Sequence, residues 1–366
     1  MQTNTPTHRF ATLDVLRGLV IVLMALDHVR GFIQPLGLNP ENLDNTTVPF
    51  FLSRWVTHLC APVFVFLMGV GAGLRASRKP EGTTHYLLSR GLWIVFLEVT
   101  VVSFSFSWDI SRTYLGVLWA LGGSMVLLAG LHRLGHRVLL SLGLLITVGL
   151  AILPVTSGFL GFGFLFVPRT IDVLGHTVHE AYALIPWFAV AAVGWGGSRW
   201  ITRAPPLRLG QVGLGMIALF AMLRVWQWGD PRPWQLQEQG MWMTAASFLN
   251  PSKYPPSLLY LLLTLGIALL ILGRPAQRDG PISRWLQMLG RVPLFFYILH
   301  LPLAHLLAGA WAWAVYDRSR VPEGTPLSML TILAAWVAVV LILTPACRYW
   351  HGLKERRSDL WWIRYL

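Results

Sequence analysis

The sequence is short of charge and of cysteine. Charged residues make up 12% of the 366 positions, and the acidic residues (16) are outnumbered by the basic ones (29). Two cysteines, Cys60 and Cys347, are too few for a disulfide framework. The sequence also lacks metal-ligand spacing, a glycine-rich phosphate loop and an internal repeat, so we expect no metal site and no repeat architecture.

Hydrophobic residues, by contrast, make up 55% of the chain. They gather in ten stretches, each about long enough for the roughly 20 helical residues that cross a bilayer. Backbone polar groups in a bilayer must pair within helices, so the sequence predicts an all-α, polytopic transmembrane helical bundle. We expect one domain, residues 1–366, with 348–366 as an interfacial tail. The predicted crossings are 11–31, 55–74, 91–107, 115–131, 138–154, 181–197, 210–226, 256–273, 292–314 and 327–346.

The basic residues are distributed unevenly between the two sides of this bundle. Nineteen Lys and Arg residues fall in the segments on the side of both termini, and seven fall in the opposite loops. This bias is the positive-inside signal, so we expect both termini in the cytoplasm. The net charge of +13 is therefore explained by topology, and we expect a lipid bilayer rather than nucleic acid as the partner. The first apolar stretch carries Asp14 and Arg17, which is not typical of a cleavable signal peptide.

Charged side chains inside the first crossing are the first candidates for function, because charge at membrane depth is costly. Asp14, Arg17 and His28 fall on one helical face, and Asp27 points about 100° away from His28. Gly18 lies on the same side and allows close approach of a neighbouring helix or ligand. The plain alternative is that Asp14 and Arg17 form a structural ion pair at the membrane edge.

A second histidine is expected at the outer depth of His28. The second crossing opens with Trp55 and His58, and consecutive crossings run antiparallel, so His28 and His58 reach the same level. With Asp27 beside them, they form a candidate acid–base cluster. The alternative is that each histidine is a hydrogen-bonded core residue.

Three further segments place polar residues in or near the membrane. Lys253 and Tyr254 begin the eighth crossing, where Lys253 either anchors at headgroups or binds a polar acceptor. His300 lies roughly 12 Å into the ninth crossing, either on a reaction path or in a structural hydrogen bond. Glu98 lies near the middle of the third crossing and needs a partner, for which Arg17, Arg224 and the histidines are candidates.

Several of these residues belong to longer sequence strings. The strings are Leu13-Asp14-Val15-Leu16-Arg17-Gly18 with Met24, Asp27 and His28; Arg54-Trp55, Thr57-His58, Ala61-Pro62 and the run to Gly69; Ser89-Arg90-Gly91 with Leu97-Glu98; Ile185-Pro186-Trp187; Lys253-Tyr254-Pro255-Pro256-Ser257-Leu258; and Gly290-Arg291-Val292-Pro293 with Phe296-Tyr297 and His300. Together they resemble one bacterial family of membrane proteins, grouped with the heparan-α-glucosaminide N-acetyltransferase catalytic domain. The resemblance covers nearly the whole chain.

The resemblance implies a transmembrane acyltransferase in a bacterial inner membrane. In the lysosomal enzyme, acetyl-CoA binds from the cytosol and a glucosamine amine waits on the far side. That enzyme's active histidine belongs to the stretch between its first two crossings, whereas the corresponding loop here, Ile33–Arg54, has no histidine. The role has therefore moved to His28 or His58, or the activity is absent.

Acyl transfer assigns a role to each group of polar residues. Arg17, Arg75, Arg90 and Arg291 are predicted to bind the phosphates of acetyl-CoA, the acyl donor, by charge-assisted hydrogen bonds. His28, His58, Asp27 and His300 are the predicted catalytic residues. The predicted contacts to an envelope glycan or sugar acceptor are Lys253, Tyr254, Trp55, Asp14 and Glu98.

Two other functions fit the same residues. A proton-coupled small-molecule transporter also uses intramembrane Asp, Glu and His, although no broken-helix pair or repeated half is apparent. A membrane scaffold without catalysis is the third hypothesis, and a homodimer is left open.

Overall fold

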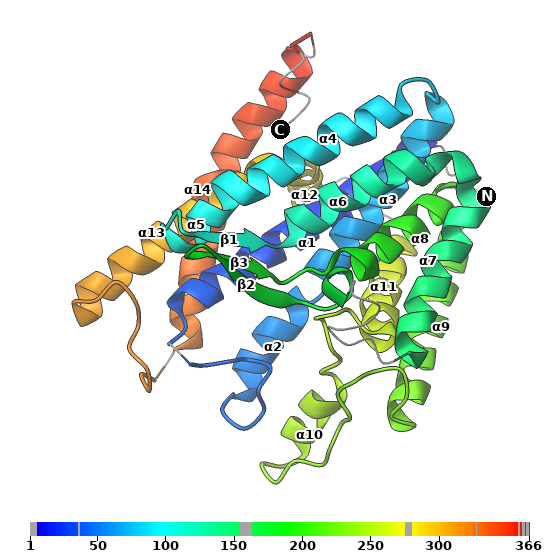
Figure 1. Cartoon of the computed structure of the whole chain (residues 1–366). Coiled ribbons are helices and arrows are strands. Elements are labelled where there is room, and N and C mark those ends of the chain that lie inside the picture. The colour runs from blue at the N-terminus through cyan, green and yellow to red at the C-terminus, as the bar shows by residue number, and fades with distance from the viewer. Residues whose placement is uncertain are drawn as a thin grey trace. The chain divides into compact units, whose positions relative to one another are not determined.

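The chain is mostly helical in the computed structural model, which describes residues 6–35, 37–153, 163–274, 280–326, 328–357, 359–360, 363 and 366. Each of the ten predicted stretches overlaps a helix (Figure 1). Residues 154 and 327 of these stretches, and residues 358, 361, 362, 364 and 365 of the predicted tail, lie outside the described part. Within the described residues, six helical segments have the length and composition of a membrane crossing: Val48–Arg78, Thr83–Ser107, Val117–Ile152, Pro206–Val225, Pro293–Tyr316 and Met329–Arg356.

The chain divides into two compact units, and unit 1 comprises Met1–Leu13, Ala61–Pro233 and Pro251–Ala276. Its helices are α3 (Cys60–Arg78), α4 (Thr83–Leu97), the π-helix η1 (Glu98–Val102), α5 (Ser103–Ser107), α6 (Val117–Leu131), η2 (His132–Leu134), α7 (Gly135–Ile152), η4 (Gly163–Leu165), α8 (Leu184–Arg203), α9 (Pro206–Val225) and α11 (Leu258–Leu272). They pack mainly in three pairs, α4 with α6, α7 with α8 and α9 with α11. α3 and α8 approach so closely that a Cβ atom at Gly69 would lie 2.1 Å from the carbonyl oxygen of Ala191.

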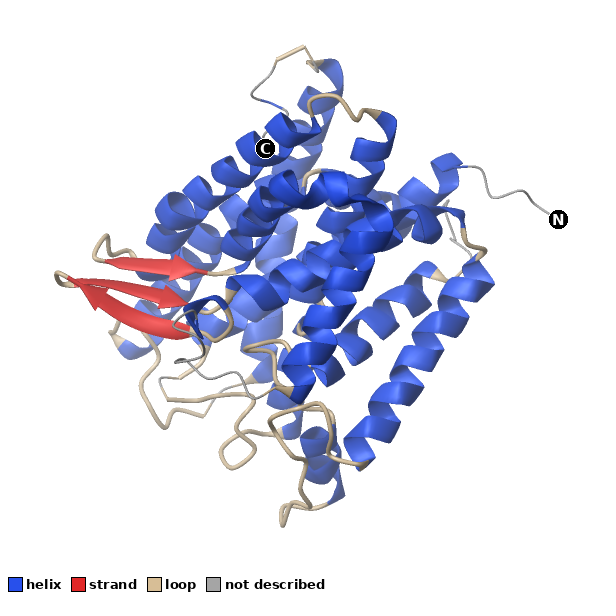
Figure 2. Cartoon of the chain, turned by 45° about the vertical axis from the view of Figure 1, so that its right-hand side comes forward, coloured by secondary structure: helices blue, strands red, loops and turns tan. Residues whose placement is uncertain are grey.

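Unit 1 also contains a small sheet that the all-α prediction missed. β1 (Arg112–Leu115) pairs in parallel with β3 (His176–Glu180), and β2 (Arg169–Val173) pairs with β3 in antiparallel fashion (Figure 2). Leu174 and Gly175 form the two-residue turn of the β2–β3 hairpin, both with positive φ (54° and 79°), as a primed hairpin turn requires. Burial raises the pKa of Glu180 at the end of β3, and the nearby Arg169 guanidinium opposes this effect.

Unit 2 comprises Asp14–Cys60, Trp234–Asn250 and Gln277–Leu366. Its helices are α1 (Pro6–Ile33, from Asp14 on), α2 (Val48–Thr57), α10 (Met241–Phe248), α12 (Pro281–Arg291), α13 (Pro293–Tyr316) and α14 (Met329–Arg356). α1 is the central element: Leu16, Val20 and Ala25 on it are buried, and Trp336 of α14 donates from its indole nitrogen to the carbonyl oxygen of Val22 at 2.8 Å.

The crossing of α1 and α12 is set by two glycines. A Cβ atom at Gly18 would lie 1.9 Å from the carbonyl oxygen of Leu286, and one at Gly290 would lie 1.9 Å from that of Asp14. No other residue fits such a distance, so these glycines fix how α12 lies against α1. The neighbour that Gly18 was predicted to admit is therefore a helix backbone.

Several helices expose large apolar side chains. Leu145 on α7, Leu214 on α9 and Leu341 on α14 are 71%, 61% and 65% exposed. Apolar faces of this kind are stable against lipid rather than water. The helices and their outward side chains therefore support an integral membrane protein.

Candidate functional site

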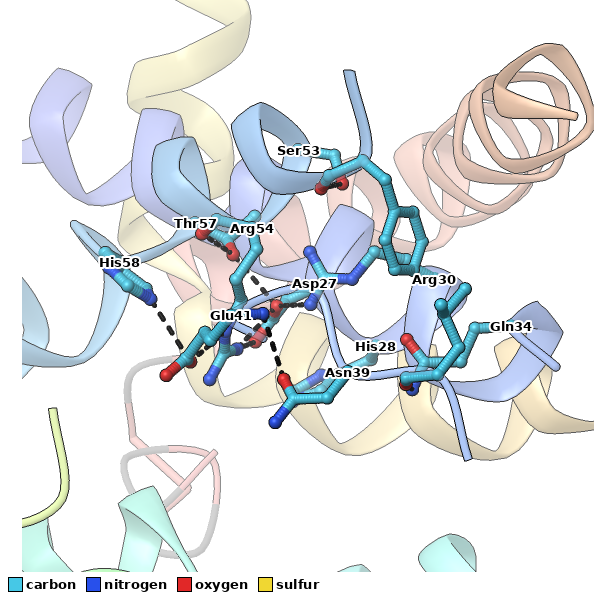
Figure 3. Close-up of polar contacts among 12 residues, drawn as sticks. Asp27, His28, Arg30, Gln34, Asn39, Glu41, Ser53, Arg54, Thr57 and His58 are labelled. Atoms are coloured by element: carbon cyan, nitrogen blue, oxygen red, sulfur yellow. Dashed lines mark hydrogen bonds and ion pairs between the residues drawn. The ribbon is translucent and has the colours of Figure 1, made fainter. Parts of the chain in front are cut away.

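Asp27, near the C-terminal end of α1, is the centre of a polar network in unit 2 (Figure 3). Arg54 of α2 places its Nη1 atom 2.8 Å from both carboxylate oxygens of Asp27. Thr57 donates its hydroxyl to Asp27 Oδ1 at 2.8 Å, and Arg30, one turn along α1, donates from Nη2 to the same oxygen. The Asp27 carboxylate therefore ties α1 to α2.

Glu41, in the connection between α1 and α2, extends the network to His58. Arg54 Nε donates to Glu41 Oε1 at 2.8 Å, and His58 Nε2 lies 3.4 Å from the same oxygen. The Glu41 backbone is held on both sides, because its N–H donates to Asn39 Oδ1 at 2.9 Å and its carbonyl accepts from Asn250 Nδ2 at 2.9 Å. Asp27 and His58 thus belong to one network, joined through two residues that the sequence did not select.

The network is largely closed to solvent. Side-chain exposure is 15% for Asp27, 4% for Arg30, 12% for Arg54, 10% for Glu41 and 4% for His58. Two carboxylates face two guanidinium groups, so the charges balance when His58 is neutral, as burial of ionic groups requires. Arg30 Nε and Nη1 have no hydrogen-bond partner in the described part of the chain, which is costly for a buried donor.

His28 follows Asp27 and contacts His300 of α13. His28 Nδ1 lies 2.6 Å from His300 Nε2, and the two rings stack with centroids 4.9 Å apart. Phe296 and Tyr297 pack around the His300 ring at centroid distances of 5.6 Å and 5.3 Å. His300 is fully buried. The sequence placed His28 beside His58 and His300 alone at mid-membrane, whereas the described contact pairs His28 with His300.

The hydrogen-bond partners determine which nitrogen of each imidazole carries hydrogen. His300 Nδ1 lies 3.2 Å from the carbonyl oxygen of Phe296, and a carbonyl only accepts, so this nitrogen is the donor. Neutral His300 then accepts at Nε2, and His28 Nδ1 must donate across the 2.6 Å contact. The lone pair of neutral His28 is consequently on Nε2, as in a histidine base that a third group orients.

A second charged cluster, Asp14 with two arginines, lies about 20 Å from His28 along α1. Arg17 Nη1 lies 2.8 Å from Asp14 Oδ1, and Arg291 Nε, at the end of α12, lies 3.3 Å from Asp14 Oδ2. The Arg291 side chain is 46% exposed. Two of the four arginines predicted to bind phosphate are thus brought together, with one carboxylate between them.

Three further predicted site residues, Glu98, Arg75 and Arg90, lie in unit 1. Glu98 is fully buried in the π-helix η1, and its Oε1 atom accepts from the backbone N–H of Gly116 at 2.5 Å. Its Oε2 atom has no hydrogen-bond partner among the described residues. Arg75 places its guanidinium 3.9 Å from the Tyr86 ring centroid, and Arg90 is half-buried on α4.

Lys253 lies beside two aromatic rings of unit 1, those of Tyr254 and Tyr182. Lys253 Nζ lies 4.9 Å from the Tyr254 ring centroid and 5.7 Å from that of Tyr182, and its side chain is buried. A buried ammonium between two aromatic rings is held by cation–π attraction rather than by headgroups. Trp55, in unit 2, is half-buried on α2 beside Arg54.

The chain matches the model of a known protein family. The family model described as heparan-alpha-glucosaminide N-acetyltransferase, catalytic, matches residues 9–223, more than half of the chain. The matched segment includes Asp27, His28 and His58 and ends before Lys253, Arg291 and His300. None of the curated proteins matches the chain.

Proposed function

Because the chain belongs to the heparan-α-glucosaminide N-acetyltransferase catalytic family, we propose that it is an integral membrane acyltransferase. The donor is cytoplasmic acetyl-CoA, and the acceptor is an amine or hydroxyl of an envelope sugar on the opposite side. The observation that carries the proposal is the His28–His300 pair, in which the contacts put the lone pair of neutral His28 on Nε2.

The proposed topology has ten crossings in a bacterial inner membrane, with both termini in the cytoplasm. It rests on the ten apolar stretches of the sequence and on the excess of Lys and Arg on one side. Reporter fusions after Arg78 and within Gln237–Ser247 should report the cytoplasmic and the outer side, respectively. Fusions that report the same side at both positions would refute this topology.

In the proposed reaction, His28 Nε2 takes a proton from the acceptor as its nitrogen or oxygen attacks the thioester carbonyl. The new N–C or O–C bond forms, the C–S bond breaks, and the CoA sulfur leaves with the proton from His28, so protons balance over the cycle. His28 is an imidazolium between these steps. Its Nδ1–H then donates to His300 as a charge-assisted bond, which is stronger than the neutral one.

His300 and the Asp27 network have supporting roles in this proposal. His300 is a positioning residue, because it acts through the His28 ring. Asp27 holds α1 against α2, and His58 contacts Glu41 in the connection between them. Arg30 Nε and Nη1, which have no hydrogen-bond partner among the described residues, offer donors to a polar acceptor. Trp55, in the same unit as His28, remains a proposed acceptor contact.

The proposed donor mouth is the Asp14–Arg17–Arg291 cluster of unit 2. Arginine suits the phosphates of CoA because its planar fork donates two hydrogen bonds at once. Asp14 orients both guanidinium groups and cancels one of their two charges, which leaves one net positive charge for the ligand.

The test uses protein reconstituted in lipid nanodiscs, labelled acetyl-CoA and a panel of amino and neutral sugars. His28→Gln should lower transfer about 100-fold or more, the usual contribution of a general base. His300→Gln keeps an acceptor for His28 Nδ1–H, so it should retain more activity than His300→Ala. His305→Gln, on the same helix, is the matched control and should transfer normally.

Two results would overturn the proposal. Full transfer by His28→Gln would exclude this histidine as the base. Uptake of a labelled sugar into vesicles without acetyl transfer, at any acetyl-CoA concentration, would favour the transporter.

A further inference from the structure

Unit 1 contains a polar cleft that the proposed reaction does not use. Its volume is about 190 Å³, far above the 10–15 Å³ that one water needs. Six polar side chains line it: Ser77 at the end of α3, Thr83 at the start of α4, His132 in η2, His136 at the start of α7, and Trp195 and Arg199 on α8. Residues of five helical segments therefore converge on one cleft.

His136 connects these segments through its two ring nitrogens. Its Nδ1 atom lies 3.1 Å from the carbonyl oxygen of Trp195 and must donate there, and its Nε2 atom lies 3.1 Å from Ser77 Oγ. Ser77 donates to the carbonyl oxygen of Gly73 at 3.0 Å and accepts from Arg199 Nε at 3.3 Å. In its neutral form His136 donates from Nδ1 and accepts at Nε2, so the single Ser77 hydrogen lies between two acceptors, the Gly73 carbonyl oxygen and His136 Nε2, while the Ser77 oxygen accepts from Arg199.

One donor beside the cleft has no acceptor among the described residues. The Trp195 ring is 1% exposed, and its indole N–H has no hydrogen-bond partner in the described ranges. His132 bonds through Nε2 to Thr84 Oγ1 at 2.9 Å, and its ring lies 6.1 Å from that of Trp195. An unpartnered buried N–H costs free energy, so the cleft favours a ligand with several acceptor oxygens.

The charge of the cleft also favours an anion. Among the described residues, no ion pair joins Arg199, His132 or His136 to a carboxylate. The flanking segments add basic residues: Arg75, Arg78, Lys79, Arg133 and Arg137. Arginine, imidazole and indole donors together suit the oxygens of a phosphate better than the two oxygens of a carboxylate.

We propose that this cleft binds a phosphate group. Its source is either a soluble phosphate ester, such as the 3′-phosphate of CoA, or the headgroup of an anionic lipid. On the proposed topology the cleft faces the cytoplasm, where both occur. The site is independent of the imidazole pair, which belongs to unit 2.

The experiment measures binding to the intact protein in phosphatidylcholine nanodiscs without an acceptor sugar. The three probes are inorganic phosphate, CoA compared with its analogue lacking the 3′-phosphate, and phosphatidic acid added to the nanodisc. Thermal stabilisation by the first probe and by one of the other two is expected, and the responding probe identifies the source. Arg199→Gln should weaken this binding about tenfold, as loss of a charge-assisted bond does.

Arg203→Gln, one turn along α8, removes the same charge outside the cleft and should bind normally. His136→Gln should weaken binding as well, whereas His85→Gln, an exposed histidine of α4, should not. Equal binding by Arg199→Gln, His136→Gln and the wild type would overturn the proposal, as would an equal response to chloride at the same ionic strength. Acetyl transfer is measured separately on the same variants. Failure of the cleft proposal is therefore distinguished from failure of the proposed transferase function.

Discussion

Replacement of Arg54 by glutamine tests whether the Asp27 network holds unit 2 together. Arg54 donates to both oxygens of Asp27 and to Glu41 at 2.8 Å. Glutamine is shorter and uncharged, so it cannot span the two carboxylates. The change leaves Asp27 and Glu41 largely buried with two negative charges and one guanidinium, that of Arg30.

The size of the effect follows from burial. Removing one partner of a buried ion pair costs 3–5 kcal/mol. Arg30 and Thr57 still bond Asp27, and the side chains of Asp27 and Arg54 keep 15% and 12% exposure. We therefore expect the lower end of the range, about 3 kcal/mol, which corresponds to a roughly 100-fold change in an equilibrium constant.

Unit 2 contains its own reporters of opening. Both cysteines of the chain, Cys60 and Cys347, are free and buried, and both belong to this unit. Labelling by a thiol-reactive dye under native conditions reads the opening equilibrium, so Arg54→Gln should label about 100-fold faster than the wild type. Arg318→Gln, an exposed arginine of unit 2, is the matched control and should stay within about 0.5 kcal/mol of the wild type.

The reasoning would be refuted if Arg54→Gln labelled no faster than the control. A double variant sharpens the result, because Asp27→Asn removes the charge that Arg54 compensates. If the two residues are coupled, the double variant should be less destabilised than the sum of the single variants, by about 1 kcal/mol or more.

Three further outcomes are expected. Arg17→Ala and Arg291→Ala should each raise the Kd for acetyl-CoA about tenfold in equilibrium binding, and unchanged affinity in both would place the phosphate site elsewhere. Gly290→Ala puts a Cβ atom 1.9 Å from a backbone oxygen of α1, so it should destabilise unit 2 by about 1–3 kcal/mol in thiol labelling, whereas Gly309→Ala, with open space around it, should not. Burial raises the pKa of Glu180 in the folded state. The protonated carboxyl therefore stabilises the fold relative to the charged carboxylate. This contribution is fully present below pH 4.5, the ordinary pKa, and is lost as pH rises through the raised pKa. Glu180→Gln should flatten that part of the pH dependence of Tm.

Hydropathy predicted the helices well and the connections poorly. A bilayer-length apolar stretch has one stable backbone conformation, so each of the ten stretches overlaps a helix. The connections have no such constraint. α2, α10 and the three strands were missed because short elements depend on partners that are distant in the sequence, as in the pairing of Arg112 with Thr177.

The sequence predicted which residues belong to the candidate site better than it predicted which of them contact one another. Asp27, His28 and His58 were found because charge and imidazole are rare at membrane depth. Glu41 was missed because it lies in a polar connection, where a carboxylate carries no signal. Arg30 is the one partner of Asp27 that the local sequence indicates, because it lies three residues from Asp27 on the same helical face.

The pairing of His28 with His300 shows what counting residues along helices leaves out. Asp14 and His28 are separated by about 21 Å along α1, whereas Arg291 and His300 are separated by only about 14 Å in an uninterrupted helix. Asp14 nevertheless contacts Arg291, and His28 contacts His300. Val292, between α12 and α13, has non-helical angles (φ −128°, ψ 43°), which lengthens that path, and the long Arg291 side chain bridges the remainder. Depth estimated from a straight helix placed His300 too far from His28 because it included neither the break nor the reach of an arginine.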